Sequence, residues 1–165
     1  MKNFSILLLF LLLLSSKIDA QRTDVYIVRH AEKEIVSAME KDPSLSEIGK
    51  KRALKLSSLF KRNKFSAVYS TSYKRTRQTV ELIAKENNLP IQEYSPKDNL
   101  KLASEILNKY KGGKVLIAGH SNTIIELSEA FGVNNPLKEI SDDDYGNIFH
   151  IIIKNNKVKL KNSRY

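Results

Sequence analysis

The sequence predicts an α/β fold: a three-layer sandwich in which helices flank a central, mostly parallel sheet. Short apolar runs rich in β-branched residues alternate with segments of helical period, the pattern of a sheet covered by helices. Two of the runs, Val25–Val28 and Val115–Ala118, are continuously apolar, as strands buried on both faces are. No repeat, low-complexity tract or linker interrupts the sequence, so we expect one domain.

The expected elements follow one another along the chain. The strands are Val25–Val28, Ala67–Ser70, an edge-like Ile91–Tyr94, Val115–Ala118, and a hairpin of Ile148–Ile153 and Val158–Leu160 around an Asn155-Asn156 turn. The helices begin at Ser46, at Thr71 or Ser72, at Asp98 and near Ser121, with Ser46 and one of Thr71 and Ser72 as N-caps.

The first twenty residues have the pattern of a secretory signal peptide. Lys2 supplies a positive n-region, Ile6–Leu14 is an apolar h-region, and Ala20 offers a small residue at the cleavage site. The apolar run is short for a membrane span, although a retained anchor stays an alternative. We therefore expect a signal peptide at residues 1–20 and one domain at residues 21–165, which is periplasmic or secreted and not membrane-bound after cleavage.

Composition narrows the choice of partners. The chain has 28 Lys and Arg against 18 Asp and Glu, a formal net charge of +10, which favours anionic partners such as phosphate esters. Nucleic acid is not expected, because no helix-turn-helix, zinc or aromatic-stacking pattern accompanies the charge. The sequence contains no cysteine, which excludes disulfides, thiol nucleophiles and thiolate metal sites.

Two histidines follow the two most apolar strands. His30, preceded by Arg29, comes after Val25–Val28, and His120 comes after Val115–Ala118 and one glycine. Ligands of open α/β sheets bind at the carboxyl ends of the strands, so one sheet could bring both histidines together. A neutral imidazole is a nucleophile toward phosphorus, and guanidinium groups bind phosphoryl oxygens. The pattern therefore indicates phosphoryl chemistry without a metal.

At these positions the chain resembles the histidine phosphatase superfamily, which includes the phosphoglycerate mutases and their phosphatase relatives. Four blocks match its motifs in order over about residues 24–153: Arg29-His30-Ala31-Glu32, Leu45-Ser46-Glu47-Ile48-Gly49, Tyr69–Thr79 with Arg75, and Gly119-His120-Ser121-Asn122. The resemblance implies the phosphoglycerate mutase-like fold and the small phosphatase branch, because the insertions that form substrate lids in mutases are missing.

The resemblance also implies roles for individual residues. His30 would be the phosphorylated nucleophile, Arg29 and Arg75 would bind phosphoryl oxygens, and His120 would stabilise the transition state. Asn122 or Ser121 would donate a further hydrogen bond to the phosphate. No cofactor or metal is expected. The substrate would be a phosphorylated small molecule or a phosphoprotein, and the oligomeric state is left open.

The general acid is not identified by any motif. Relatives often carry one as Glu or Asp before the Gly-His block, where this chain has Glu93, Asp98 and Glu105 as candidates. Some small members have no obvious acid and favour good leaving groups. Without an acid, the substrate would be a phosphoramidate or an acyl phosphate.

Other residues have simpler interpretations or support rival functions. Arg77 points to another helix face than Arg75, His150 is expected to be a strand residue, and Asp142-Asp143-Asp144 a solvated loop rather than a metal site. A serine hydrolase could use Ser121 with Asp144 and His150, but Thr123 stands where its nucleophile elbow needs glycine. A phosphate- or phosphoprotein-binding module on the same fold is the alternative that is not an enzyme.

Overall fold

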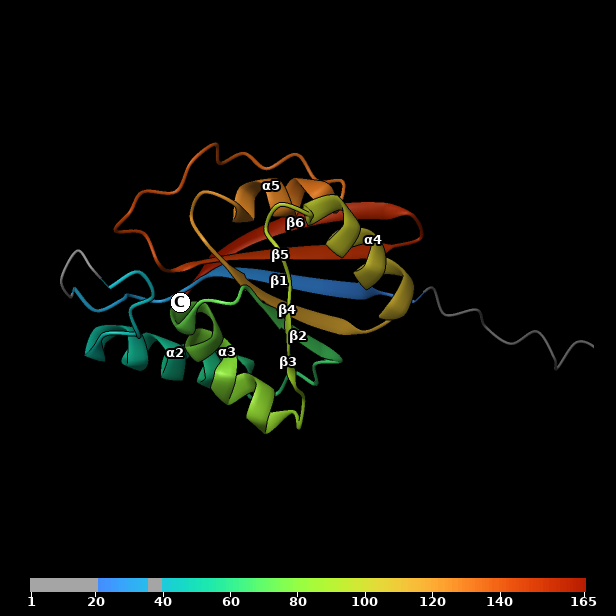
Figure 1. Cartoon of the computed structure of the whole chain (residues 1–165). Coiled ribbons are helices and arrows are strands. Elements are labelled where there is room, and N and C mark those ends of the chain that lie inside the picture. The colour runs from blue at the N-terminus through green and yellow to red at the C-terminus, as the bar shows by residue number, and fades with distance from the viewer. Residues whose placement is uncertain (1–20, 36–39) are drawn as a thin grey trace, which may run out of the picture.

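The computed structural model describes residues 21–35 and 40–165, so the predicted signal peptide lies outside the described residues. In this part of the chain six strands form one sheet, in the order β3-β2-β4-β1-β5-β6 (Figure 1). The strands are β1 (Thr23–Arg29), β2 (Ala67–Ser70), β3 (Ile91–Glu93), β4 (Lys114–Gly119), β5 (Asn147–Lys154) and β6 (Lys157–Arg164). The helices are α2 (Glu47–Phe60), α3 (Lys74–Glu86), α4 (Asn99–Lys109) and α5 (Ile124–Ala130).

The sheet is mixed, with its parallel strands together. β3, β2, β4 and β1 are parallel, whereas β5 and β6 run antiparallel as a hairpin at the other edge. Asn155 and Asn156 form the predicted turn, and both have positive φ (51° and 59°), which asparagine tolerates well. The mostly parallel three-layer sandwich is therefore confirmed.

Helices cover both faces of the sheet. Figure 1 shows α2 and α3 on one face and α4 and α5 on the other. The face under α4 and α5 buries a core of fully buried side chains that includes Ile27, Ile106, Ile117 and Leu127. The opposite core contains Leu56 of α2 and residues of α3. Burial of each side chain of this size stabilises the folded state by about 1.5–3 kcal/mol. The apolar strands and the apolar helix faces therefore supply the main driving force for this arrangement.

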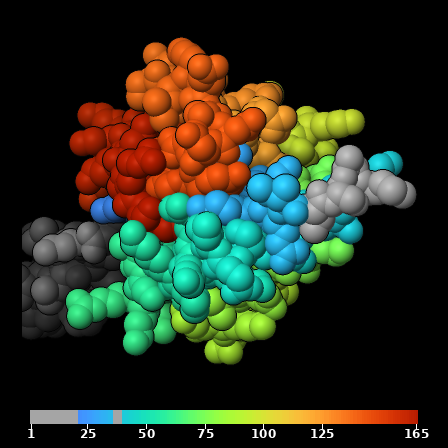
Figure 2. All heavy atoms as spheres, turned by 90° about the vertical axis from the view of Figure 1, so that its left-hand side faces the viewer, coloured from blue at the N-terminus to red at the C-terminus, as the bar shows by residue number. Residues whose placement is uncertain are grey.

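The central register brings the two histidines to one edge. β1 pairs with β4 from Asp24 opposite Lys114 to Arg29 opposite Gly119. The His30 amide continues this ladder by donating to the Gly119 carbonyl at 2.9 Å. In Figure 2 this carboxyl edge faces the viewer, with blue residues that follow β1 between the orange segment before β5 and the cyan residues of α2.

One glycine explains how closely α2 packs against the chain after β1. A Cβ on Gly49 would lie 2.1 Å from the Glu32 carbonyl oxygen, so only glycine allows this turn of α2 to approach the loop after β1. Ser46 caps the helix as predicted, since its hydroxyl accepts from the Gly49 amide. Together these contacts fix α2 against the chain that carries His30.

Two predicted helix starts are wrong. α3 begins after Tyr73 without a side-chain cap, because the Thr71 hydroxyl bonds to Thr76 and His120 instead. α5 begins at Ile124 rather than near Ser121, because residues 121–123 form a turn that follows His120. In both places polar side chains that resemble N-caps lie at the carboxyl edge of the sheet and do not cap a helix: Thr71 bonds to His120, and Ser121 lies in the turn after His120. Among the described residues, no helix is long and apolar enough to cross a membrane.

Candidate active site

His30 is held as a neutral imidazole with a defined tautomer. Its side chain is buried, and Nδ1 lies 2.8 Å from the Ala31 carbonyl oxygen. Because a carbonyl only accepts, Nδ1 carries the proton and Nε2 keeps its lone pair. Burial, with smaller contributions from the charges of Arg75 and Arg29, lowers the pKa of His30 to about 3, although the bond to Ala31 opposes the shift. The geometry thus leaves Nε2 free to act as a nucleophile at neutral pH.

His120 lies beside His30 and is oriented by two threonines. The ring centroids of the histidines are 5.3 Å apart. His120 Nε2 lies 2.9 Å from the Thr71 hydroxyl, which lies 2.8 Å from the Thr76 hydroxyl. Thr76 donates its hydroxyl proton to the Tyr73 carbonyl at 2.7 Å, so it accepts from the Thr71 hydroxyl. Because Thr71 donates to Thr76, it accepts from His120, and His120 Nε2 therefore carries a proton. Burial first, and then the two nearby arginine charges, lower the pKa of His120 to about 4.

Arg29 is anchored under the loop before β5. It is 4% exposed, and its Nη1 donates to the carbonyl oxygens of Ser141 and Asp144 at 2.8 and 3.1 Å. The guanidinium also lies 4.0 Å from the ring centroid of Tyr145. Within the described residues its buried Nε has no hydrogen-bond partner. Arg29 therefore holds a positive charge at the site with a donor still available.

Arg75 places a second guanidinium at the same site from the first turn of α3. Its charge acts on both His30 and His120. The guanidinium lies 4.3 Å from the ring centroid of Tyr73, and its Nη1 is 3.8 Å from Asp42 Oδ1. In the part of the chain that is described, the buried Nε of Arg75 has no partner either. Two positive charges with free donors suit an anion that has several oxygens.

The four side chains line one cavity of about 460 Å³. Its wall also includes Asn122, Ser121 and Thr123 of the turn after His120, so the two predicted phosphate-binding candidates, Asn122 and Ser121, lie at this cavity. Five lining residues were not singled out from the sequence as part of a site: Lys33, Tyr73, Pro96, Asp142 and Tyr145. Tyr73 lies inside the Tyr69–Thr79 block, and its place next to Arg75 in that block is the signal in the sequence that could have identified it.

The acidic run before β5 is more than the predicted solvated loop. Asp142 is exposed and faces Arg29, with Nη2 and Oδ1 3.8 Å apart, while the Ser141 and Asp144 carbonyls anchor that arginine. Asp144 itself pairs with Arg164 of β6 at 2.8 Å. Among the described residues, no group of three or more His, Cys, Asp and Glu could hold a metal ion.

The candidate general acids lie away from this cavity. Glu93, Asp98 and Glu105 line a neighbouring cavity beside β3 and α4, where Glu105 accepts from the Tyr69 hydroxyl at 3.1 Å. Within the described residues, Asp142 is the carboxylate that lines the cavity of His30, and its side chain is fully exposed. Sequence position near a strand end was therefore insufficient to place an acid at the site.

The serine hydrolase arrangement is not assembled. His150 lies on β5, where its Nε2 is 2.5 Å from Asp24 Oδ1 and its ring stacks on Tyr26 at 4.1 Å. Asp144 is engaged by Arg164 and Asn147. Ser121 lines the cavity of His30, but its proposed partners are held elsewhere. Arg77 is exposed on α3, as its helical position relative to Arg75 predicts.

Buried neutral histidines should make the free energy of unfolding pH-dependent. The pKa of His30 is about 3 in the folded chain against 6.5 for a free side chain, so acid protonates the unfolded state first. Stability is fully present above pH 6.5 and falls as the pH drops toward 3. Between pH 6.5 and 5 the loss is about 1.6 kcal/mol for His30. In urea unfolding, we expect the free energy of unfolding of His30→Gln to fall less over this pH interval, by the contribution of His30. Equal pH dependence in both proteins would contradict this prediction.

Comparison with known proteins places this site in context. The model of the histidine phosphatase superfamily (branch 1) matches residues 25–96, which include Arg29, His30 and Arg75. The resemblance to the histidine phosphatase superfamily is confirmed. No curated protein matches the sequence.

Solved structures share the fold of this superfamily. A mycobacterial glucosyl-3-phosphoglycerate phosphatase has a TM-score of 0.67 and 11% identity, over 87% of this chain and 98% of its own. A phosphoglycerate mutase from Bacillus anthracis has a TM-score of 0.60 and 15% identity, over 88% and 94%. A phosphoserine phosphatase from Entamoeba histolytica, in complex with phosphoserine, has a TM-score of 0.59 and 13% identity, over 84% and 95%. At these identities the likeness shows the fold alone, and it confirms the phosphoglycerate mutase-like architecture.

Proposed function

We propose that the protein is an exported, metal-independent phosphatase that acts through a phosphohistidine at His30. The observation that carries this proposal is the convergence of His30, His120 and two guanidinium groups in one cavity, with Nε2 of His30 unprotonated. Phosphoryl transfer needs positioning and charge neutralisation more than covalent help from the protein. Arg29 and Arg75 supply that neutralisation without a metal. Export rests on the signal-like pattern of residues 1–20 and implies a periplasmic or secreted enzyme.

The geometry supports a two-step reaction. In the first step, the Nε2 lone pair of His30 attacks phosphorus, and the bond from phosphorus to the leaving group breaks with its electron pair. In the second step, water attacks the phosphorus of phosphohistidine, and the electron pair of the N–P bond returns to Nε2 as phosphate departs. A bound phosphoryl dianion favours the protonated form of His120, which then donates to a phosphoryl oxygen.

The residues that line the cavity limit the kinds of leaving group that the reaction favours. Among the described residues, the carboxylate that lines it, Asp142, is fully exposed, so no buried carboxyl group is held at the site to donate a proton to the leaving group. Leaving groups that need little protonation are therefore favoured, such as phenolates or the imidazole of a phosphoramidate. A mutase reaction is not favoured, because the chain lacks the insertions expected to cover a diphosphorylated intermediate.

Turnover of p-nitrophenyl phosphate by residues 21–165 tests the proposal, since its phenolate leaves without a general acid. We expect turnover that is unchanged after dialysis against EDTA. A rate that EDTA removes and a divalent metal restores would contradict metal independence. Binding of inorganic phosphate without turnover of this substrate or of phosphohistidine would favour a binding module on the same fold.

A further inference from the structure

A second cavity lies beside the active site, along α5. This cavity, the α4/α5 groove, has a volume of about 560 Å³ and lies between the segment that starts α4 and the exposed side of α5. Pro96 and Thr123 line the active-site cavity, whereas the groove is lined by Lys97, the next residue after Pro96, and by Glu126, about one helical turn beyond Thr123. The groove therefore lies next to the phosphoryl site, along the same two segments of the chain.

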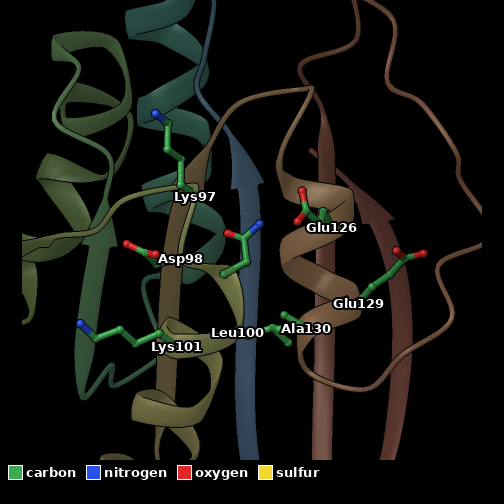
Figure 3. A pocket seen from close by; sticks show the side chains of 8 residues that line it. Lys97, Asp98, Leu100, Lys101, Glu126, Glu129 and Ala130 are labelled. Atoms are coloured by element: carbon green, nitrogen blue, oxygen red, sulfur yellow. The ribbon is translucent and has the colours of Figure 1, made fainter.

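One wall of the groove is acidic, and the other carries two lysines and one aspartate. Figure 3 shows Lys97 and Lys101, with Asp98, on the side of α4, and Glu126 and Glu129 on the side of α5. These side chains are exposed, so a ligand between the walls could reach both sets. A peptide in extended conformation points successive side chains to opposite sides. Alternating basic and acidic side chains would thus meet complementary walls.

A buried amide in the groove points to a ligand with both a donor and an acceptor. Asn99 lines the groove and is 4% exposed. Within the described residues neither its Oδ1 nor its Nδ2 has a hydrogen-bond partner. Buried polar groups are nearly always paired, so two orphaned atoms on one side chain need an explanation. A main-chain peptide unit offers the matching carbonyl oxygen and amide hydrogen.

We propose that the α4/α5 groove binds the peptide segment that flanks the phosphorylated residue of a phosphoprotein substrate. This inference rests on the proposed phosphatase function and selects a protein substrate over a small phosphorylated metabolite. From Thr123 to Ala130, α5 advances about 10 Å, which matches about three residues of an extended chain. The phosphorylated side chain occupies the cavity of His30, and the flanking residues lie along α5 with a peptide unit paired to Asn99.

Two synthetic ligands with the same leaving group test the groove. The first is a phosphotyrosine peptide with alternating lysine and glutamate on both sides, and the second is N-acetyl-phosphotyrosine amide. We expect kcat/KM to be at least tenfold higher for the peptide, mainly through KM. Fluorescence anisotropy of the labelled peptide measures binding separately, so it reports on the groove even if turnover is absent.

Two variants assign any preference to the groove. Asn99→Leu and Glu126→Lys are expected to weaken peptide binding at least fivefold while turnover of p-nitrophenyl phosphate is unchanged. Glu86→Lys, which makes the same charge change on the exposed end of α3, is the matched control and should bind the peptide like the original protein.

The outcomes separate the two proposals. Equal kcat/KM for both ligands, or equal peptide affinity in the original protein and Asn99→Leu, would overturn the groove while leaving the phosphatase proposal intact. Peptide binding that depends on Asn99 with no turnover of any phosphoester or phosphohistidine would overturn the phosphatase and support the groove.

Discussion

Replacing His30 by alanine is expected to lower kcat for p-nitrophenyl phosphate by about 10⁴-fold or more, because it removes the nucleophile on which both steps depend. The fold should persist, since His30 contacts the core through its backbone bond to Gly119, which alanine keeps. Steady-state rates of the variant and of the original protein measure the effect, with circular dichroism to verify folding.

His150→Ala is the matched control for this experiment. Like His30, His150 has a hydrogen-bonded ring nitrogen, although its partner is the Asp24 carboxylate, and it lies on β5 and does not line the cavity of His30. We expect its turnover to stay within about threefold of the original. A loss in His150→Ala equal to that in His30→Ala would indicate a structural cause in both, and a His30→Ala protein that keeps its activity would eliminate His30 as the nucleophile.

Arg75→Met is expected to reduce kcat/KM by about 10²- to 10³-fold, because it removes a preorganised positive charge from the transferring phosphoryl group. Methionine keeps much of the aliphatic length of arginine, so packing in the first turn of α3 should change little. The effect should appear in kcat as well as KM, since charge spreads over the phosphoryl oxygens in the transition state.

Arg77→Met supplies the comparison for Arg75. Both substitutions remove one positive charge from the same helix, but Arg77 is exposed and lies two positions further along. If the effect of Arg75 is long-range electrostatics, both substitutions should lower the rate equally. If Arg75 contacts the phosphoryl group directly, only Arg75→Met should lower it. Progress curves at several salt concentrations would separate these cases, because exposed charges are screened at high salt. Equal losses in both variants would contradict a direct role for Arg75.

The central part of the fold was predictable because it depends on local patterns. The apolar runs of β1 and β4 are continuous and β-branched, and burial on both faces admits few alternatives. The position of His30 and His120 after these strands indicated that one sheet could bring them together, and the structure places the rings 5.3 Å apart. Ser46 was a correct N-cap because its hydroxyl can accept from the Gly49 amide while it donates to the Glu32 carbonyl.

The parts that escaped prediction depend on contacts between distant segments. Thr71 looks like a cap in sequence, yet its hydroxyl is used by His120, which lies 49 positions away. The carbonyls of Ser141 and Asp144 hold Arg29 across more than a hundred residues, so nothing local marks that loop as part of the site. The candidate acids do not reach the cavity: Glu93 ends β3, Asp98 precedes α4 and Glu105 lies within α4, and all three line the neighbouring cavity, because sequence position does not fix side-chain direction.

Trapping the phosphorylated protein tests the central claim most directly. The protein is mixed with p-nitrophenyl phosphate, quenched in strong base within milliseconds, and measured by intact mass and peptide mapping. The account predicts one phosphoryl group on His30 that acid removes and base preserves, and none in His30→Ala. A phosphoryl group on Ser121, or rapid turnover without any trapped phosphohistidine under these conditions, would contradict it.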